Sequence, residues 1–224
     1  MQSGLPLVSA FNWVPDFARG HVRDLRVRWA LEEIGRPYET VLLDATTPRG
    51  TDYLSWQPFG QVPALRERGF AMFESGAILL YLGQDDERLL PREAQARWRA
   101  VSWLFAALNS VEPALTALVD MKLFYADQPW SGAAFATLRP AADKRLAQLS
   151  QGLGQDEWLA ARFSAADIMM ITVLKIANTM DLLPGHPALQ AYFQRGLARP
   201  AYQRALAAQL DDFTSEAPKQ IEGA

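Results

Sequence analysis

Strand-like sequence patterns are confined to the first 84 residues of this 224-residue chain. In that part, short runs rich in β-branched and aromatic residues alternate with segments whose apolar residues recur every three or four positions, the period of a helix. The strands are expected at residues 5–11, 38–43, 62–67 and 70–73, and the helices at 19–34 and 75–84. An irregular or short helical stretch lies between the second and third strands. This order of elements predicts a small α/β domain.

The remainder of the chain carries helical periodicity only. A charged stretch at 85–92 (DDERLLPR) follows the first domain and is interpreted as a linker. Helices are expected at 94–126, 133–151, 165–178, 187–197 and 201–210. Pro113 should kink or break the first of these, because proline lacks the backbone donor that a helix interior uses. The predicted fold is a thioredoxin-like α/β domain at 1–84, the linker, and an all-α domain at 93–224.

The first predicted helix is apolar on two faces. The apolar residues are Val22, Leu25 and Trp29 on one face and Val27, Ala30, Leu31 and Ile34 on the other. A helix with two apolar faces has to be covered on both sides. We therefore expect it to lie between its own sheet and the second domain.

Composition excludes several classes of function. The chain has no cysteine, which removes disulfides, thiolate zinc sites and cysteine nucleophiles. Its two histidines, His21 and His186, are far apart in sequence, so neither a histidine-rich metal centre nor a serine–histidine–aspartate triad is expected. The net charge of −3 is unlike that of a nucleic-acid-binding domain. Neither a signal peptide nor a membrane-spanning run is recognised, and we expect a cytoplasmic protein with no membrane partner.

The segment at 163–168 (FSAADI) predicts the start of a helix. Ser164 can cap the helix through its hydroxyl, and Asp167 can accept a hydrogen bond from the Ser164 amide. Phe163 can then pack on Ile168 across the turn. Such helix starts are common, so we assign the segment a folding role and no chemistry.

Two short segments carry the strongest functional signal. They are 59–65 (FGQVPAL) and 73–78 (FESGAI), in which Glu74 follows Pro63 by 11 positions. Together they resemble the glutathione site of the cytosolic glutathione transferases. In that family an aromatic-Gly-Gln-apolar-Pro stretch opens the third strand, and an acidic or amide residue followed by Ser comes 11 positions after the proline. The segment at 164–167 resembles the capping box of the same family, so the resemblance runs through the whole chain.

The resemblance assigns glutathione contacts to Gln61, Val62, Pro63, Glu74 and Ser75, with no metal. A cis peptide before Pro63 exposes the backbone N–H and C=O of Val62, which could pair with the cysteinyl backbone of the tripeptide. Ser75, at a helix N-terminus, suits the γ-glutamyl carboxylate, and Glu74 suits the ammonium group. Taken singly, a proline in a bend and a serine at a helix start are ordinary structural features.

Other contacts are left open by the motifs. Three residues lie where the partner of the glycyl carboxylate is expected, although each can equally be a loop residue: Arg49, Trp56 and Gln57. Three arginines line one side of the first predicted helix, as a solvated stripe or as a source of positive potential: Arg19, Arg23 and Arg26. Three residues are candidates for a second-substrate pocket, although an apolar face there is more often core: Trp103, Met121 and Tyr125.

The group that activates the glutathione sulfur departs from the family pattern. The family uses Tyr, Ser or Cys after the first strand, and residues 11–20 contain none of them. The spacing of Ser-type members points to His21, whereas a helix beginning near Asp16 would point to Asn12 or Trp13. Lowering a thiol pKa by about two units takes roughly 2.7 kcal/mol. One hydrogen bond to a charged group supplies about 1.5–3 kcal/mol, so an Asn amide or a backbone N–H could suffice. We favour Asn12, with His21 second.

The resemblance implies a homodimeric glutathione transferase. Glutathione thiolate would add to a hydrophobic electrophile, or would reduce a hydroperoxide or a disulfide. Phe59 stands where several members carry an aromatic key that enters the partner subunit; the alternative is that it folds back on its own third strand. Because the expected Tyr or Ser is missing, the rival interpretation is a non-catalytic member that binds ligands or other proteins.

Overall fold

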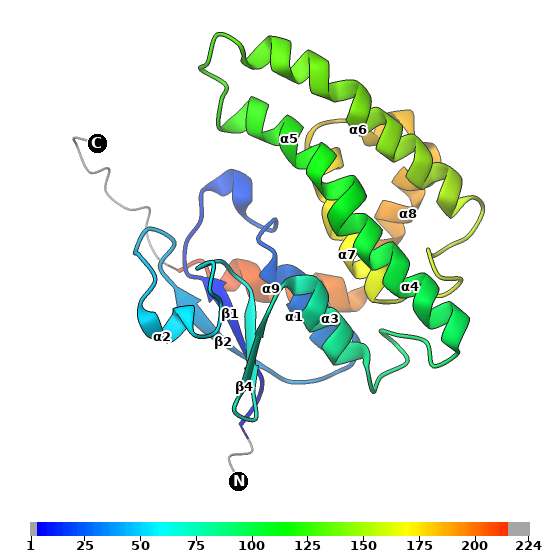
Figure 1. Cartoon of the computed structure of the whole chain (residues 1–224). Helices are drawn as coiled ribbons and strands as arrows, with labels where there is room; N and C mark the ends of the chain where they lie inside the picture. The colour runs from blue at the N-terminus through cyan, green and yellow to red at the C-terminus, as the bar shows by residue number, and fades with distance from the viewer. Residues whose placement is uncertain (1–3, 215–224) are drawn as a thin grey trace, which may run out of the picture. The chain divides into compact units, whose positions relative to one another are not determined.

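The computed structural model describes residues 4–214 and divides into two compact units. Unit 1 comprises the chain up to Leu82 together with the chain from Pro200 onward, and unit 2 is Gly83–Arg199. Unit 1 holds the sheet, and unit 2 is helical (Figure 1). The predicted combination of a thioredoxin-like α/β part and an all-α part is confirmed.

The sheet of unit 1 has four strands in the order β2-β1-β3-β4. The strands are β1 (Leu7–Phe11), β2 (Glu39–Leu43), β3 (Ala64–Glu67) and β4 (Phe70–Phe73). β1 pairs with β2 in parallel and with β3 antiparallel. β3 and β4 form the predicted hairpin around Arg68 and Gly69, whose φ angles of 51° and 78° suit a tight two-residue turn.

The helical elements of unit 1 are η1 (Asp16–Ala18), α1 (Asp24–Glu33), α2 (Thr51–Leu54), α3 (Ser75–Gly83) and α9 (Pro200–Asp211). In Figure 1, α2 lies on one side of the strands and α3 on the other. α1 begins five residues later than predicted, at Asp24. The reason is local: η1 is followed by turns in which Gly20 has φ +74°, a conformation that a right-handed helix does not contain.

α1 is buried on both predicted faces. It packs against β1 of the sheet and against α9, which belongs to the same unit. The Trp29 ring meets the Tyr202 ring edge-on, with centroids 4.9 Å apart. The sequence placed 201–210 in the helical domain, but this segment packs in unit 1. Long-range packing decides this placement, because nothing in the local pattern of α9 names its partner.

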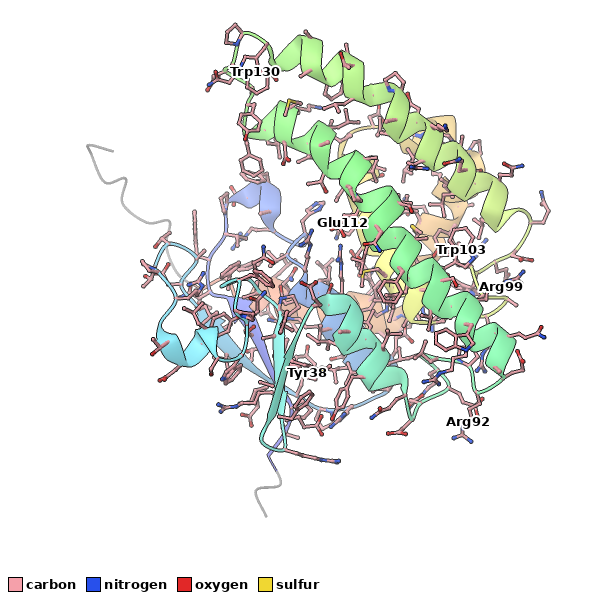
Figure 2. All side chains as sticks on the ribbon, viewed as in Figure 1. Tyr38, Arg92, Arg99, Trp103, Glu112 and Trp130 are labelled. Carbon is pink, nitrogen blue, oxygen red and sulfur yellow. The ribbon has the colours of Figure 1, made fainter. Side chains whose placement is uncertain are left out.

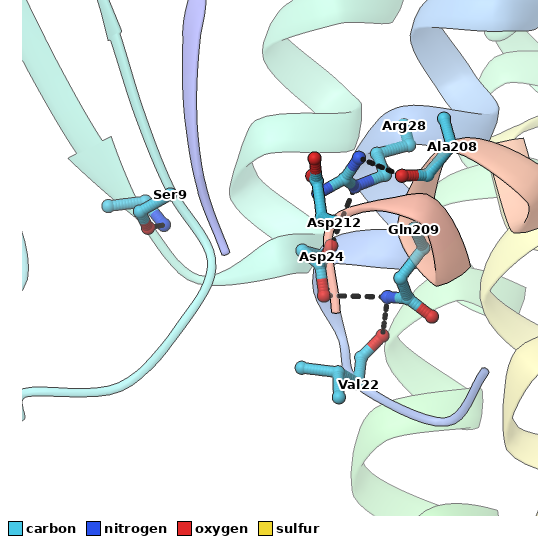
Figure 3. A network of polar contacts seen from close by, with 8 residues as sticks. Ser9, Val22, Asp24, Arg28, Ala208, Gln209 and Asp212 are labelled. Carbon is cyan, nitrogen blue, oxygen red and sulfur yellow. Dashed lines mark hydrogen bonds and ion pairs between the residues drawn. The ribbon is translucent and has the colours of Figure 1, made fainter. Parts of the chain in front are cut away.

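A polar network fastens α9 to the start of α1 (Figure 3). The buried guanidinium of Arg28 donates to Asp24 at 2.7 Å, to Asp212 at 2.5 Å and to the Ala208 carbonyl at 3.2 Å. The Gln209 amide donates to Asp24 at 2.7 Å. Burial raises the pKa of Asp24 to about 6 although Arg28 opposes the shift. Loss of one partner from such a pair costs about 3–5 kcal/mol, because the other charge stays buried.

Unit 2 consists of α4 (Ala94–Ala106), η2 (Ala107–Val111), α5 (Glu112–Leu123), α6 (Ser131–Leu153), α7 (Ala165–Thr179), η3 (Leu183–Gly185) and α8 (Pro187–Leu197). α7 is its most buried helix. Pro113 does not end the first long helix: the π-helical segment η2 separates α4 from α5, and Pro113 lies in the first turn of α5. A widened turn accommodates the missing donor, so the chain continues as helix.

The predicted capping box opens α7. The Ser164 hydroxyl and the Asp167 carboxylate cap the helix reciprocally, with the Ser164 amide 2.9 Å from Asp167 Oδ2. Asp167 Oδ1 also accepts from the Leu159 amide at 3.0 Å and from the Tyr192 hydroxyl at 2.9 Å. Burial raises the pKa of Asp167 to about 6, although these hydrogen bonds oppose the shift. The segment ties three parts of unit 2 together, as a folding role requires.

One helical stretch of the described chain, Ala94–Leu123, is long and apolar enough to cross a membrane by length and composition alone. Its individual apolar runs are short, so the sequence did not mark it. Within unit 2 it packs against α6 and α7. Core helices of globular folds meet the same criterion.

Candidate functional site

The turn before β3 contains the predicted cis peptide, between Val62 and Pro63. Gly60, two residues earlier, has φ +68°, and its carbonyl accepts a hydrogen bond from Arg49 Nε at 3.1 Å. Within residues 4–214, the backbone N–H and C=O of Val62 make no hydrogen bond to the protein. The turn therefore leaves unpaired the backbone groups that an extended peptide ligand could use.

The register of the β3–β4 hairpin explains the 11-residue spacing between Pro63 and Glu74. Ala64 pairs with Phe73, and the next step along the same register places Pro63 opposite Glu74. β1 runs antiparallel to β3, with Val8 opposite Leu65. The C-terminal ends of β1 and β4 and the N-terminal end of β3 thus share one edge of the sheet. The spacing motif is a consequence of a four-residue hairpin ladder.

Glu74 and Ser75 connect β4 to α3 at this edge. Glu74 is exposed and has φ +68°. Its carbonyl accepts the Ile78 amide at 3.0 Å, so Glu74 occupies the capping position and Ser75 is the first helical residue. The sequence predicts Ser75 as the N-terminal residue of this helix; in the structure the cap is Glu74, one residue earlier. The first amides of α3 remain directed at this edge, which favours an anion.

Arg26 is a site residue whose role the sequence left undecided. It lies in α1, is 3% exposed, and donates from Nη1 to Ser75 Oγ at 3.2 Å. The three arginines do not form one helical stripe: Arg19 precedes α1 and contacts the Phe213 carbonyl, and Arg23 is the residue before the helix. The buried cation beside Ser75 strengthens the positive potential at the start of α3.

Asn12 directly follows β1, at the same edge. Its amide N–H donates to the Leu43 carbonyl at 3.0 Å, which continues the β1–β2 ladder. The side-chain Oδ1 is buried and, among the described residues, has no hydrogen-bond partner. Buried polar atoms are nearly always paired, so an orphan at this position calls for a water or a ligand.

His21 occupies the exposed turn between η1 and α1, and its backbone N–H donates to the Ala18 carbonyl at 2.9 Å. Both candidate activators therefore lie in the connection between β1 and α1. Trp13, the third residue that the sequence left open, is half-buried there. The preference for Asn12 over His21 stays a prediction.

The three candidates for the glycyl carboxylate are engaged with the protein. Arg49 also donates to the Asp44 carbonyl at 2.5 Å and the Thr47 carbonyl at 2.8 Å. Gln57 is buried and accepts the Phe59 amide at 2.6 Å. The indole of Trp56 lies under the Arg66 guanidinium, 4.1 Å from its centre. Each of the three shapes the loop between α2 and β3.

The second-substrate candidates lie in unit 2, and Figure 2 labels one of them, Trp103. Trp103 fills the space above Gly152 of α6, where an added Cβ would come within 2.6 Å of the indole, so it is a packing residue. The Met121 carbonyl accepts the Ser131 hydroxyl at 2.6 Å. The Tyr125 ring contacts the Trp130 ring at a tilt of 44°, with centroids 5.3 Å apart, at the connection between α5 and α6. Residues 4–214 contain no cluster of three His, Cys, Asp or Glu side chains that could hold a metal ion.

Comparison with known proteins identifies the family of this chain. Residues 17–84 match the family description "Glutathione S-transferase, N-terminal domain", and residues 102–195 match "Glutathione S-transferase, C-terminal domain". Glutathione S-transferase GstA of Escherichia coli O157:H7 is 31% identical over 188 residues, which are 80% of this chain and 90% of that protein. Glutathione S-transferase 3 of Zea mays is 30% identical over 82% of this chain and 88% of its own length.

A solved structure has the same fold. A glutathione transferase family member from Pseudomonas fluorescens Pf-5, crystallised with two glutathione bound, superposes with a TM-score of 0.80. It is 25% identical, and the match covers 92% of this chain and 94% of the other. The two domain matches and the curated relatives identify the family, and the solved structure shares the fold. This chain belongs to the glutathione S-transferase family.

Proposed function

We propose that this chain binds glutathione at the sheet edge formed by Asn12, the Val62–Pro63 turn and the start of α3. The unpaired backbone of Val62 would pair with the cysteinyl residue of the tripeptide. The first amides of α3 with Ser75 would hold the γ-glutamyl carboxylate, and Glu74 its ammonium group. Gln61, whose side chain is exposed beside the turn, would contact the peptide as well.

The observation that carries the proposal is the β3–β4 register, which sets Pro63 opposite Glu74. This register brings the unpaired backbone of Val62 and the N-terminus of α3 to one edge of the sheet. A γ-glutamyl peptide would use the first for its backbone and the second for its carboxylate. Crystals of the Pseudomonas fluorescens relative with bound glutathione support the choice of ligand.

The proposed reaction is transfer of the glutathione sulfur to a hydrophobic electrophile. The thiol proton leaves for solvent, and the thiolate forms the C–S bond while the leaving group departs with its electron pair. With a hydroperoxide, the thiolate attacks the peroxide oxygen and releases the alcohol. A second glutathione then forms the disulfide and releases water. An electrophile such as a halonitrobenzene and a hydroperoxide test the two routes.

Asn12 is the proposed activator of the sulfur. Its side-chain amide forms no hydrogen bond to the described residues. Its Nδ2 could therefore donate a hydrogen bond to a thiolate, while its buried Oδ1 accepts a hydrogen bond from a bound water or from the ligand. One such charged hydrogen bond supplies about 1.5–3 kcal/mol, enough to move the thiol pKa by one to two units.

The second candidate is a glutathione-binding member without catalysis, favoured by the absence of Tyr, Ser and Cys from residues 11–20. Titration calorimetry with glutathione, followed by turnover assays with the electrophile and the peroxide, separates the two. Binding with turnover is the expected result. Binding without turnover of either substrate would support the non-catalytic role, and absence of binding would overturn both.

We also propose a cytoplasmic homodimer in which Phe59 enters the partner subunit. The Phe59 side chain is 69% exposed, and its ring touches Phe73 edge-on with centroids 6.0 Å apart. The contact is with β4 and not with the third strand that the alternative names, and most of the Phe59 side chain remains exposed. An exposed aromatic in a proline-flanked loop is a suitable interface anchor.

A further inference from the structure

A network of two buried hydroxyl groups, those of Tyr53 and Ser9, forms hydrogen bonds to the backbone of the cis-proline turn. The Tyr53 hydroxyl of α2 donates to the Gln61 carbonyl at 2.5 Å and lies 2.8 Å from Ser9 Oγ of β1. Ser9 Oγ in turn accepts the Ala64 amide at 2.7 Å. Ser9 is 0% exposed and Tyr53 is 9% exposed. Three segments of unit 1 therefore meet at these two hydroxyls.

The hydroxyl protons of Ser9 and Tyr53 can be arranged in only one way in this network. The Ala64 amide can only donate, so Ser9 Oγ is its acceptor, and the Gln61 carbonyl can only accept, so the Tyr53 proton points to it. The remaining Ser9 proton must then point to Tyr53 Oη. Each hydroxyl both donates and accepts, and hydrogen bonds linked in this way strengthen one another. Burial also raises the pKa of Tyr53, although Ser9 opposes the shift, so the phenol keeps the proton that Gln61 needs.

The network holds the backbone on both sides of Val62 and Pro63 and leaves Val62 itself unpaired. The Gln61 carbonyl and the Ala64 amide face inward to the hydroxyls. The N–H and C=O of Val62 have no partner among the described residues. The tethers thus fix the peptide groups that flank the proposed ligand-pairing residue.

We propose that Tyr53 and Ser9 are positioning residues that hold the Val62 backbone ready to pair with the cysteinyl residue of a γ-glutamyl tripeptide. This inference rests on the proposed glutathione site. Holding a binding group in its bound geometry lowers the ordering cost of binding, so the hydroxyls act on affinity without touching the ligand. A purely structural role would instead lower stability and affect all ligands alike.

The test is Tyr53→Phe, which removes one oxygen and keeps the ring that packs near Trp56. We expect the calorimetric Kd and the KM for glutathione to rise about tenfold, with kcat at saturating glutathione within about twofold of the parent. Ser9→Ala should shift both constants in the same direction. Tyr81→Phe is the matched control, because its hydroxyl contacts Glu67 at a long 3.4 Å, away from the turn, and its constants should not change.

A truncated ligand separates positioning from general stability. The γ-methyl ester of glutamate keeps the γ-glutamyl group but has neither the cysteinyl N–H nor the cysteinyl C=O that would pair with Val62. Its affinity should be equal in the parent and in Tyr53→Phe. An unchanged Kd for glutathione in the folded variant, or an equal loss for both ligands, overturns the inference. If the parent itself binds no glutathione, the proposed function fails first, and the two failures are therefore distinguishable.

The variants stay informative if one of them is unstable. Ser9→Ala and Tyr53→Phe each remove a different hydroxyl from the same hydrogen-bond network, so either variant alone tests the positioning role. If both unfold at 20 °C while Tyr81→Phe does not, the hydroxyls serve the fold as a whole, and the positioning role is rejected.

Discussion

Arg26 and Ser75 are joined by a buried hydrogen bond, with Arg26 Nη1 donating to Ser75 Oγ at 3.2 Å. The bond links α1 to the first residue of α3, which are 49 positions apart in the chain. It orients the serine hydroxyl, whose oxygen accepts from the arginine and whose proton is left for another acceptor. A carboxylate at the start of α3 would complete this arrangement.

Replacing Ser75 with Ala should therefore weaken glutathione binding. We expect a loss of about 1–3 kcal/mol, the scale for one hydrogen bond to a charged group. Titration calorimetry measures the change, and Ser102→Ala, an exposed serine on α4, is the matched control. Unchanged affinity in folded Ser75→Ala would show that the γ-glutamyl carboxylate is held elsewhere.

Asn12→Ala should lower kcat/KM for an electrophile by about 10- to 100-fold, because the thiolate loses a donor. His21→Ala should keep the parent activity. The pH–rate profile separates the candidates, since a histidine partner would add the ionisation of its imidazole to that of the thiol, whereas an asparagine partner adds none. Full activity in both variants would assign the role to a backbone donor or to another residue.

Phe59→Ala should convert the proposed dimer to monomers at micromolar concentration. The cost is roughly 2–4 kcal/mol per ring, and two-fold symmetry applies it twice. Sedimentation velocity reports the change. Phe70→Ala is the control, because Phe70 is also exposed, at 55%, but starts β4 at the opposite end of the hairpin. A Phe59→Ala protein that remains dimeric at nanomolar concentration would exclude Phe59 as the anchor.

Asp167 should make the free energy of unfolding depend on pH. Its pKa is raised from 3.8 to about 6 in the folded chain, so the folded state holds a proton that the unfolded state has released. The group's favourable contribution is fully present below about pH 4 and is lost as the pH rises through about 6, a change of roughly 3 kcal/mol.

Urea unfolding of the parent and of Asp167→Asn between pH 4 and 7 tests this. The asparagine variant cannot titrate, so the stability of the parent relative to the variant should fall as pH rises. Other carboxylates contribute equally to both proteins and cancel in the difference. A difference that is constant or rises with pH would contradict the raised pKa.

Elements with a local signal follow the sequence closely. The Arg68–Gly69 turn, the strand Phe70–Phe73, the helix Pro187–Leu197 and the α7 capping box all depend on neighbours within a few positions. The spacing of the two segments proposed to bind glutathione belongs to this group as well, because the 11 positions from Pro63 to Glu74 span one hairpin. The periodicity of apolar residues and the residue types at turns predict these elements, and both can be recognised in one sequence without its relatives.

The sequence by itself therefore determined the class of fold, the register of the β3–β4 hairpin, and the two segments, 59–65 and 73–78, that meet at the sheet edge of the proposed site. Only the tertiary structure decided which residues support this edge and which helix covers α1: Tyr53 contacts Gln61, Arg26 contacts Ser75, and α9 packs on α1. Ser9 reaches Tyr53 across 44 positions, and Gln209 reaches Asp24 across 185. Such contacts form because packing brings remote polar groups into a low-dielectric interior where each must find a partner, and no local pattern names that partner in advance.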